Sequence, residues 1–360
     1  SDLNPLFTWN TSIGQWSNLT DFPVYNLKPE RTNSFEVGMN MRFLKNFELD
    51  VTYYNAKTMN QTFNPELPVG EYARIYIQTG AVRNQGLELA LNYNNTWKDF
   101  TWNTGVTYSM NKNKILTLAD NAINPITGEK FSISSLNMGG LGSTRFILKE
   151  GGSMGDIYSL MDLKRDANGA VYIDENNSVV TESLEANNYI KLGSVLPKGN
   201  LAWRNNFSWK NINVAFLVSA RLGGVVFSRT QAVLDNFGVS EASAAARDKG
   251  YVSVNGNDRV NPEGWYSVVA GGTAVPQYYI YSATNIRLQE ASIGYTIPRK
   301  WLGNVCDIKV SLIGRNLWMI YNKAPFDPES VASTDNFYQG IDYFMMPSLR
   351  NIGFNLSFKF

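Results

Sequence analysis

Apolar and polar side chains alternate along several stretches of this sequence, and this alternation constrains the fold more than any other feature. Between residues 35 and 43 every odd position is apolar and every even position is polar or glycine: Phe35, Val37, Met39, Met41 and Phe43 against Glu36, Gly38, Asn40 and Arg42. Successive side chains of a β-strand point to opposite faces, so this stretch predicts a strand with one apolar face. The alternation returns over residues 47–53 after a short turn, which predicts a β-hairpin.

The hairpin pattern recurs along the chain. Alternating stretches face each other across short links over residues 87–108, 200–221 and 285–315, and another runs from Leu349 to Phe360. With a weaker candidate around Arg145–Tyr158, the sequence predicts roughly ten strands of about ten residues, the length that a tilted strand needs to cross a lipid bilayer. The predicted fold class is all-β, a transmembrane antiparallel β-barrel with long extracellular loops.

The links between the hairpins are much longer than the links inside them. They cover residues 56–85, 111–144, 162–199, 223–284 and 316–348. Such loops are uncommon in compact soluble domains, whereas short turns at one end and long loops at the other are typical of outer-membrane barrels. A large soluble β-sandwich or β-helix is the alternative, but its apolar face would need a second sheet. Inside the longest loop, Ser240 and Gly250 are good end signals for one helix, interpreted as loop decoration.

The positions of aromatic and charged residues fit the barrel prediction. Aromatic rings favour the level of the lipid headgroups, and they cluster here near predicted strand ends: Tyr53, Tyr54, Trp97, Phe100, Trp102, Tyr108, Trp203, Trp209, Trp301 and Trp318. A charge facing lipid is costly, so charged residues on the polar faces are expected to point into the lumen, mainly as structural pairs: Glu36, Arg42, Glu48, Asp50, Glu88, Arg204, Arg287, Glu290 and Lys309.

Composition excludes several classes of function. The 32 Lys and Arg residues balance 31 Asp and Glu residues, so no excess of basic charge indicates a nucleic-acid partner. The chain has no histidine, which excludes a Ser-His-Asp triad or a His-rich zinc site within it, and no enzyme is predicted. Its single cysteine, Cys306, excludes an internal disulfide framework. No apolar run reaches the length of a transmembrane helix, and the beginning reads as internal to a longer polypeptide.

Several motifs resemble those of one transporter family. Residues 27–38 (LKPERTNSFEVG) resemble a strand opener of TonB-dependent transporters, and residues 84–88 (NQGLE) resemble their Asn-x-Gly-x-Glu strand start. More specific are residues 283–298 (ATNIRLQEASIGYTIP), 314–317 (GRNL) and the closing stretch 347–360. In order and spacing these motifs are similar to the SusC-like TonB-dependent outer-membrane transporters of Bacteroidetes. A final strand that ends on an aromatic residue also resembles the signal read by the barrel assembly machinery.

The resemblance implies that residues 1–360 are the C-terminal part of a 22-strand barrel. The plug domain and early strands would lie outside this sequence, and the last strand would pair with the first strand of the barrel. The implied function is TonB-dependent active import of an oligomeric nutrient, a glycan or a peptide, across the outer membrane of a Gram-negative bacterium. The alternatives are a TonB-dependent siderophore or metal-chelate receptor without a lid partner, an outer-membrane enzyme and a passive porin.

The resemblance also implies partners. A SusD-like surface lipoprotein would cover the mouth of the barrel, the TonB complex would act through the missing N-terminal part, and outer-membrane lipid would surround the wall. Dimers of transporter–lipoprotein pairs are compatible with this arrangement.

Two groups of residues are candidate sites. Flat aromatic rings can stack on sugars or grip peptide side chains, and the ligand-binding candidates in the loops are Trp265, Tyr266, Tyr278, Tyr279, Phe337, Tyr338 and Tyr343. Packing against the barrel wall or the lid is the alternative for each. Asp166, Asn168 and Glu175 fit part of a calcium-binding loop, but Lys164 occupies the first ligand position. A plain Asx-Gly turn is therefore favoured there, and no cofactor is expected.

Overall fold

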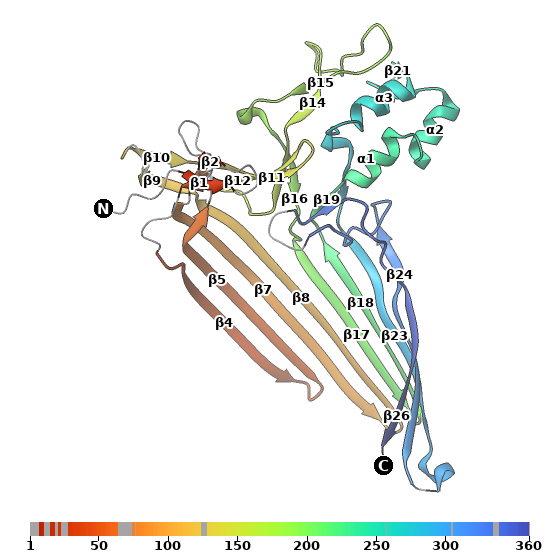
Figure 1. Cartoon of the computed structure of the whole chain (residues 1–360). Coiled ribbons are helices and arrows are strands. Elements are labelled where there is room, and N and C mark those ends of the chain that lie inside the picture. Colours follow the sequence, from red (N-terminus) through yellow and green to blue (C-terminus); the bar gives the residue numbers. More distant parts are fainter. Residues whose placement is uncertain are drawn as a thin grey trace.

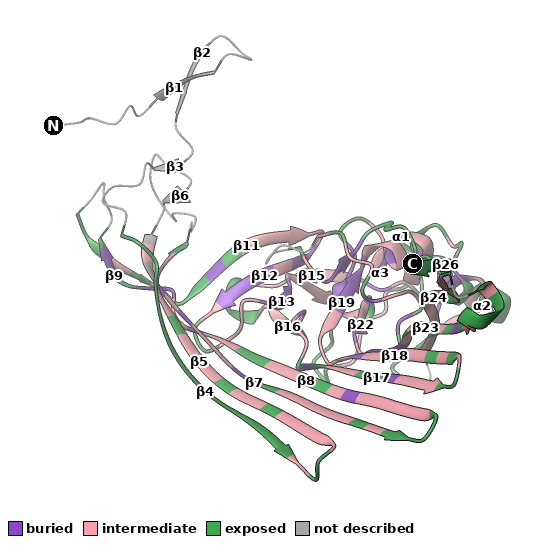
Figure 2. Ribbon diagram, turned by 90° about the horizontal axis from the view of Figure 1, so that it is seen from below, coloured by how far each residue is buried: buried purple, intermediate pink, exposed green. Residues whose placement is uncertain are grey.

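One long, curved antiparallel sheet forms the frame of the molecule, and a folded loop region lies at one end of it (Figure 1). The computed structural model describes residues 7–10, 15–18, 21–22, 28–63, 74–75, 77–123, 128–256, 258–303, 305–333 and 338–359. The nine strands of the sheet, in spatial order, are β4 (Arg31–Phe43), β5 (Phe47–Phe63), β7 (Ile77–Trp97), β8 (Phe100–Thr117), β17 (Gly199–Trp209), β18 (Ile212–Leu222), β23 (Asn285–Ile297), β24 (Asp307–Asn322) and β26 (Asn351–Lys359). In the described part of the chain, β4 and β26 are its two edges, and the sheet forms an open arc (Figure 2).

The four predicted hairpins and the final strand are confirmed. The turns at residues 44–46, 98–99, 210–211 and 298–306 all lie at the end of the sheet opposite the loop region (Figure 1). Every neighbouring pair of these nine strands is antiparallel. The predicted pairing of the last strand with an upstream first strand stays a prediction, since β26 pairs with β24 among the described residues.

The predicted tenth strand, around Arg145–Tyr158, is wrong. This stretch contains two short strands, β12 (Thr144–Lys149) and β13 (Asp156–Ser159), which pair with each other in a separate four-stranded sheet of the loop region. Their residues are mostly buried on both faces, whereas most residues of a wall strand such as β4 are exposed or only partly buried. The Gly151–Gly152 turn between them fixes the break, because Gly151 has a φ of +85°.

Several strands are much longer than the predicted ten residues. Strands β5, β7 and β8 have 17, 21 and 18 residues. Alternation is required only where one face is covered by apolar surroundings, so it marks only part of such a strand. Beyond that part the sequence is polar on both faces, as at residues 111–114 (NKNK) of β8, and backbone pairing continues without the pattern.

The strand registers give the sheet one apolar and one polar face. One cross-strand row reads Leu49, Leu91, Val106, Trp203, Val218 and Leu288, and we call this side the apolar face. A row of the opposite side reads Thr52, Glu88, Ser109, Asn200, Arg221 and Asn285, and we call it the polar face. The parity predicted for residues 47–53, 87–93 and 100–108 is confirmed, and the same two faces continue across β17, β18 and β23, where a register shift lies beside Gln289.

Aromatic rings form a continuous ladder on the apolar face near the turns. Ring centroids are 4.7 Å apart for Phe47–Tyr93, 5.3 Å for Tyr93–Trp102 and 6.1 Å for Trp102–Phe207. The Trp102 indole N–H donates to the side-chain oxygen of Asn205 at 3.0 Å, and Asn205 is itself buried beneath the rings. The ladder therefore gives the buried Asn205 oxygen a donor within the protein while presenting an apolar surface outward.

The buried core lies in the loop region. Two clusters of buried apolar residues fill the space among the loops. The first contains Phe146 and Phe227, and the second contains Ile115 and Leu148. The predicted helix is confirmed as α2 (Glu241–Lys249), with Ser240 as N-cap and Gly250 at φ +82°. Helices α1 (Arg229–Asn236) and α3 (Pro262–Val269) were not predicted, and the loop region is a packed unit and more than decoration. Among the described residues no helix is long and apolar enough to span a membrane.

Short strands tie the loops together. Strand β19 pairs with β22 and, in parallel, with β25, so that the loop after β18 is joined to the loop after β24. The Ser228 hydroxyl of β19 also donates to the Asp342 carboxylate of β25 at 2.6 Å. The remaining short elements are β1 (Phe7–Asn10), β2 (Gln15–Asn18), β3 (Asp21–Phe22), β6 (Arg74–Ile75), β9 (Ala119–Ile123), β10 (Lys130–Ile133), β11 (Ser135–Leu141), β14 (Met161–Leu163), β15 (Thr181–Ser183), η1 (Ala186–Asn188), β16 (Ile190–Ser194), β19 (Val225–Ser228), β20 (Val252–Val254), β21 (Asp258–Val260), η2 (Pro276–Tyr278), β22 (Ile280–Ser282), η3 (Arg299–Leu302) and β25 (Ile341–Asp342).

Candidate functional site

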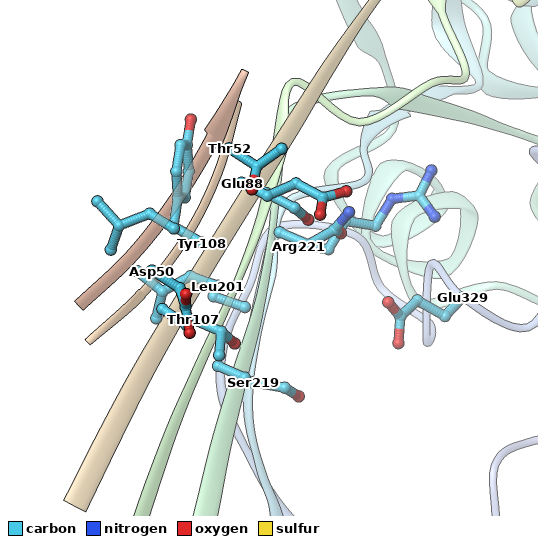
Figure 3. A pocket seen from close by; sticks show the side chains of 15 residues that line it. Asp50, Thr52, Glu88, Thr107, Tyr108, Leu201, Ser219, Arg221 and Glu329 are labelled. Carbon is cyan, nitrogen blue, oxygen red and sulfur yellow. The ribbon is translucent and has the colours of Figure 1, made fainter. Parts of the chain in front are cut away.

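A hollow of about 550 Å³ lies on the polar face, below the loop region. Strands β5, β7, β8, β17 and β18 supply most of its lining, and Glu329 reaches it from the loop after β24 (Figure 3). Its charged and polar lining residues are Asp50, Thr52, Glu88, Thr107, Ser109, Asn200, Ser219, Arg221 and Glu329. We call this cavity the lumenal hollow.

Register explains why these residues meet. Thr52, Glu88 and Ser109 belong to one polar row, which continues through Asn200 to Arg221, and Asp50 belongs to the row beside it. The lining offers three carboxylates, one guanidinium and several hydroxyls. This set can bind charged and hydrogen-bonding groups of a solute, and it holds no nucleophile paired with a base.

Sequence analysis found part of this lining. Asp50 and Glu88 were predicted to face the lumen, and both line the hollow. Thr52 and Ser219 were missed, although the parity of their strands identifies them. Glu329 was also missed, because it lies in a loop without alternation and only the folded chain brings it to the wall.

The Asn-x-Gly-x-Glu motif of β7 shapes the wall beside the hollow. A Cβ atom on Gly86 would lie 2.5 Å from the ring of Tyr54, so only glycine leaves room for this ring across the strand. The Tyr54 hydroxyl donates to the side-chain oxygen of Asn111 at 3.2 Å. Asn84 accepts hydrogen bonds from the amides of Asn111 and Asn113 at 3.1 and 2.9 Å. The motif thus joins β5, β7 and β8 by side-chain hydrogen bonds on the side of Glu88 that is nearer the loop region.

Arg287, from the motif at residues 283–298, anchors a loop to the polar face. Its side chain is only 6% exposed and forms ion pairs with Asp327 at 2.8 Å and with Glu329 at 2.7 Å. Asn285, on the same strand, accepts from the guanidinium at 3.2 Å. Arg287 was predicted to form a solvated pair with another lumen charge or with the plug; it does form structural ion pairs, but they are buried and their carboxylates come from the loop after β24. Through Glu329 this anchor also shapes the lumenal hollow.

The anchor should be sensitive to acid. Burial alone would raise the pKa of Asp327, but hydrogen bonds from Arg287, Ser348 and the Glu329 backbone, together with the Arg287 charge, hold this pKa below its usual value of 3.8. A depressed pKa stabilises the folded state above the unfolded pKa, and this contribution is lost as the pH falls through the folded pKa. We therefore expect amides near residues 326–332 to stay protected from hydrogen exchange at pH 5 and to lose protection only below about pH 4. Asp327→Asn should abolish this step, and an unchanged profile in that variant would contradict the assignment.

The loop aromatics fall into different environments. Tyr279 is buried, and its hydroxyl donates to Asp235 at 3.0 Å. Burial and the neighbouring Asp235 carboxylate raise the pKa of Tyr279 far above its usual range and that of Tyr281 to about 12, so both remain donors. Trp265 and Tyr278 form an edge-to-face pair with centroids 5.2 Å apart.

The remaining aromatic candidates are spread over the loop region. Tyr266 lines a second hollow of about 330 Å³, together with Asp235, Arg247 and Glu263. Tyr338 and Tyr343 are exposed and lie in the loop after β24, and Phe337 falls outside the described residues. The structure therefore does not gather the six described candidates into one pocket, and the contact of all seven with a ligand stays a prediction.

The calcium candidate forms two consecutive turns. The Asp166 carboxylate accepts from the backbone N–H groups of Asn168 and Ala170 at 2.8 and 3.0 Å, which is the favoured Asx turn. Asp174 accepts from the N–H groups of Asn176 and Ser178 in the same way. In the described part of the chain no three acidic, Cys or His residues gather as a metal site. Calcium binding by Asp166, Asn168 and Glu175 stays a prediction.

Comparisons with known proteins agree with the architecture. Residues 2–317 match the family described as TonB dependent receptor-like, beta-barrel. The chain is 27% identical to TonB-dependent receptor P3 of Formosa agariphila, over 95% of this chain and 35% of that protein. It is also 27% identical to TonB-dependent receptor P26 of the same organism, over 93% of this chain and 35% of that protein. The chain thus spans about a third of the length of these relatives.

Solved structures show the same fold. The RagAB peptide importer in its open-open state superposes with a TM-score of 0.70 at 17% identity, over 98% of this chain and 37% of that one. Its closed-closed state gives a TM-score of 0.66 at 16% identity, over 92% and 35%. The predicted resemblance to TonB-dependent transporters is confirmed, and this family consists of outer-membrane transport receptors and not of enzymes. The alternating strands, the parity of the wall and the match over residues 2–317 lead to one conclusion: this chain belongs to the TonB-dependent receptor family, as part of its β-barrel.

Proposed function

We propose that this chain forms part of an outer-membrane receptor that imports an oligomeric nutrient in a TonB-dependent step, with a SusD-like lipoprotein as its lid. The observation that carries the proposal is the lumenal hollow, a charged cavity on the polar face directly below the loop region. In a barrel wall the polar face lines the lumen, so a solute that passes the loops would meet this hollow next.

The lining favours a peptide over a neutral glycan. Asp50, Glu88 and Glu329 can pair with amino groups, and Arg221 can pair with carboxylates. A neutral glycan would need stacking rings and neutral hydrogen-bonding groups, and charges would add little to its binding. The solved neighbour with the same fold is named a peptide importer, which is consistent with this choice.

Uptake by a deletion strain that expresses the full-length receptor tests the proposal. The double variant Asp50→Asn/Glu88→Gln should lower the apparent affinity for lysine-rich peptides about tenfold, because two pairing charges are lost, and it should leave neutral peptides nearly unchanged. Glu36→Gln, a carboxylate on the polar side of edge strand β4 outside the hollow, is the matched control.

The outcomes separate the alternatives. Uptake of glycans but not peptides would overturn the peptide assignment and keep the transporter. A growth defect confined to iron limitation, together with the absence of a copurifying lipoprotein, would instead favour the siderophore receptor. Large constitutive permeability of the intact protein in liposomes would contradict gated import.

A further inference from the structure

A third hollow, of about 460 Å³, lies on the apolar face across β18, β23, β24 and β26. One cross-strand row of this face reads Phe216, Ala291, Gly314 and Ile352. The two central residues are small and the two outer residues are large, so the surface is recessed between them. We call this recess the outer groove.

The walls of the outer groove are almost entirely apolar. Leu288 and Leu317 border it on the side of the loop region, and Ile293 and Leu312 border it on the side of the turns. The Leu317 side chain folds over Gly314, where a Cβ atom would lie 2.5 Å from it. A recess lined by methyl groups on a face that contacts hydrocarbon fits an acyl chain.

Two basic turns lie directly below the outer groove. The β17–β18 turn contains Lys210, and the β23–β24 turn contains Arg299 and Lys300, which are all exposed. Two hydrogen bonds join these turns: the Thr296 N–H donates to the Asn211 carbonyl at 2.8 Å, and the Asn211 amide donates to the Thr296 carbonyl at 2.6 Å. The cations are thereby held on neighbouring strand ends.

The spacing and the flanking residues suit a membrane lipid. From Ile293 at the groove to the start of the turn is roughly 16 Å along the strand, which is comparable to the length of an acyl chain below its headgroup. The exposed rings of Trp209 and Trp301 flank the basic residues, and the Lys210 ammonium lies 5.5 Å from the centre of the Trp209 ring. Amphipathic rings beside cations are typical of the headgroup level.

The Lys210 backbone is left-handed, with a φ of +51°, a conformation that glycine or asparagine adopts most readily in a two-residue hairpin turn. Lys98 in the β7–β8 turn has a φ of +52°, so the two turns share this backbone and Lys98 can serve as a matched control.

We propose that the outer groove and these turns form a binding site for an anionic phospholipid. One acyl chain fills the recess over Ala291 and Gly314, and the phosphate of the headgroup contacts Lys210 and Lys300. The site rests on the proposed membrane position of the sheet but not on the identity of the transported nutrient.

The test compares lipid retention by the full-length receptor in native mass spectrometry, with phosphatidylglycerol and phosphatidylethanolamine of identical acyl chains as probes. The wild-type protein should retain phosphatidylglycerol preferentially. Lys210→Asn/Lys300→Gln should weaken this retention at least tenfold, because both cations that contact the anionic headgroup are lost. Asparagine tolerates the left-handed turn, so Lys210→Asn should not impair folding.

Two further variants make the result decisive. Lys98→Asn changes a turn lysine with the same left-handed backbone, φ +52°, beside the stacked rings of Trp97 and Phe100 and away from the outer groove, and it should retain lipid like the wild type. Ala291→Phe fills the recess without changing charge and should weaken retention of both lipids. Equal retention of the two lipids by the wild type, an equal loss in Lys98→Asn, or no effect of Ala291→Phe would overturn the site. Nutrient uptake, measured separately, would distinguish such an outcome from failure of the proposed transport function.

Discussion

Replacement of Arg287 by methionine is expected to lower the free energy of unfolding by about 3–5 kcal/mol and to expose the loop at residues 323–333 to protease. The buried guanidinium pairs with Asp327 and Glu329, and methionine would leave both carboxylates without their cation while keeping most of the side-chain volume. Asp327 is affected most, because its side chain is only 10% exposed. Denaturant unfolding of the refolded protein in detergent, together with limited proteolysis, measures both effects.

The matched control is Arg315→Gln. Arg315 of β24 pairs with Glu290 of β23 at 3.0 Å, also on the polar face, but both side chains are exposed. An exposed ion pair contributes at most about 1 kcal/mol, so this variant should behave nearly as the wild type. Equal losses in the two variants would show that burial does not decide the strength of the Arg287 anchor.

The second large effect is expected at Leu91. Leu91→Lys places a charge on the apolar face about seven residues from the β7–β8 turn, roughly 16 Å deep along a tilted strand and hence near the middle of a bilayer about 30 Å thick. A lysine at this depth on a lipid-facing strand costs about 2–4 kcal/mol. Reversible unfolding in lipid vesicles should show this loss.

Its neighbour Ala90 supplies the control. Ala90 lies on the polar face directly opposite Asp50, so Ala90→Lys adds the same charge beside a carboxylate. We expect no loss of stability in this variant. If Ala90→Lys proved the more costly of the two, the assignment of the apolar and polar faces would have to be reversed.

The sequence predicted the wall strands well because their side chains follow a local pattern, the alternation of apolar and polar residues. Phe35, Leu49 and Leu91 alternate with polar neighbours, and this parity alone assigned Asp50 and Glu88 to the polar face. The alternation does not cover the whole of β7, which begins ten residues before Leu87, where the prediction began it, and in that stretch Val82 is buried in the core of the loop region.

The loop region follows no such rule. Glu329 and Arg221 reach the same hollow from segments more than a hundred residues apart, and nothing in either local sequence indicates their meeting. Tyr279 resembled an exposed stacking ring by composition, yet the three helices bury it against Asp235. Packing among long loops depends on contacts between segments that are distant in the sequence. Local sequence patterns carry no information about which of these segments meet.

The length of β7 has a mechanical consequence. Its 21 residues would rise about 50 Å at the usual rise and tilt of a barrel strand, roughly 20 Å beyond a hydrocarbon layer of about 30 Å. In that upper part β7 remains paired with β5 and, from Ala81 onward, with β8, with register shifts near Gln61 and Ala81. In a membrane, the height of the loop region above the bilayer would therefore be set by this backbone pairing and not by the thickness or fluidity of the lipid.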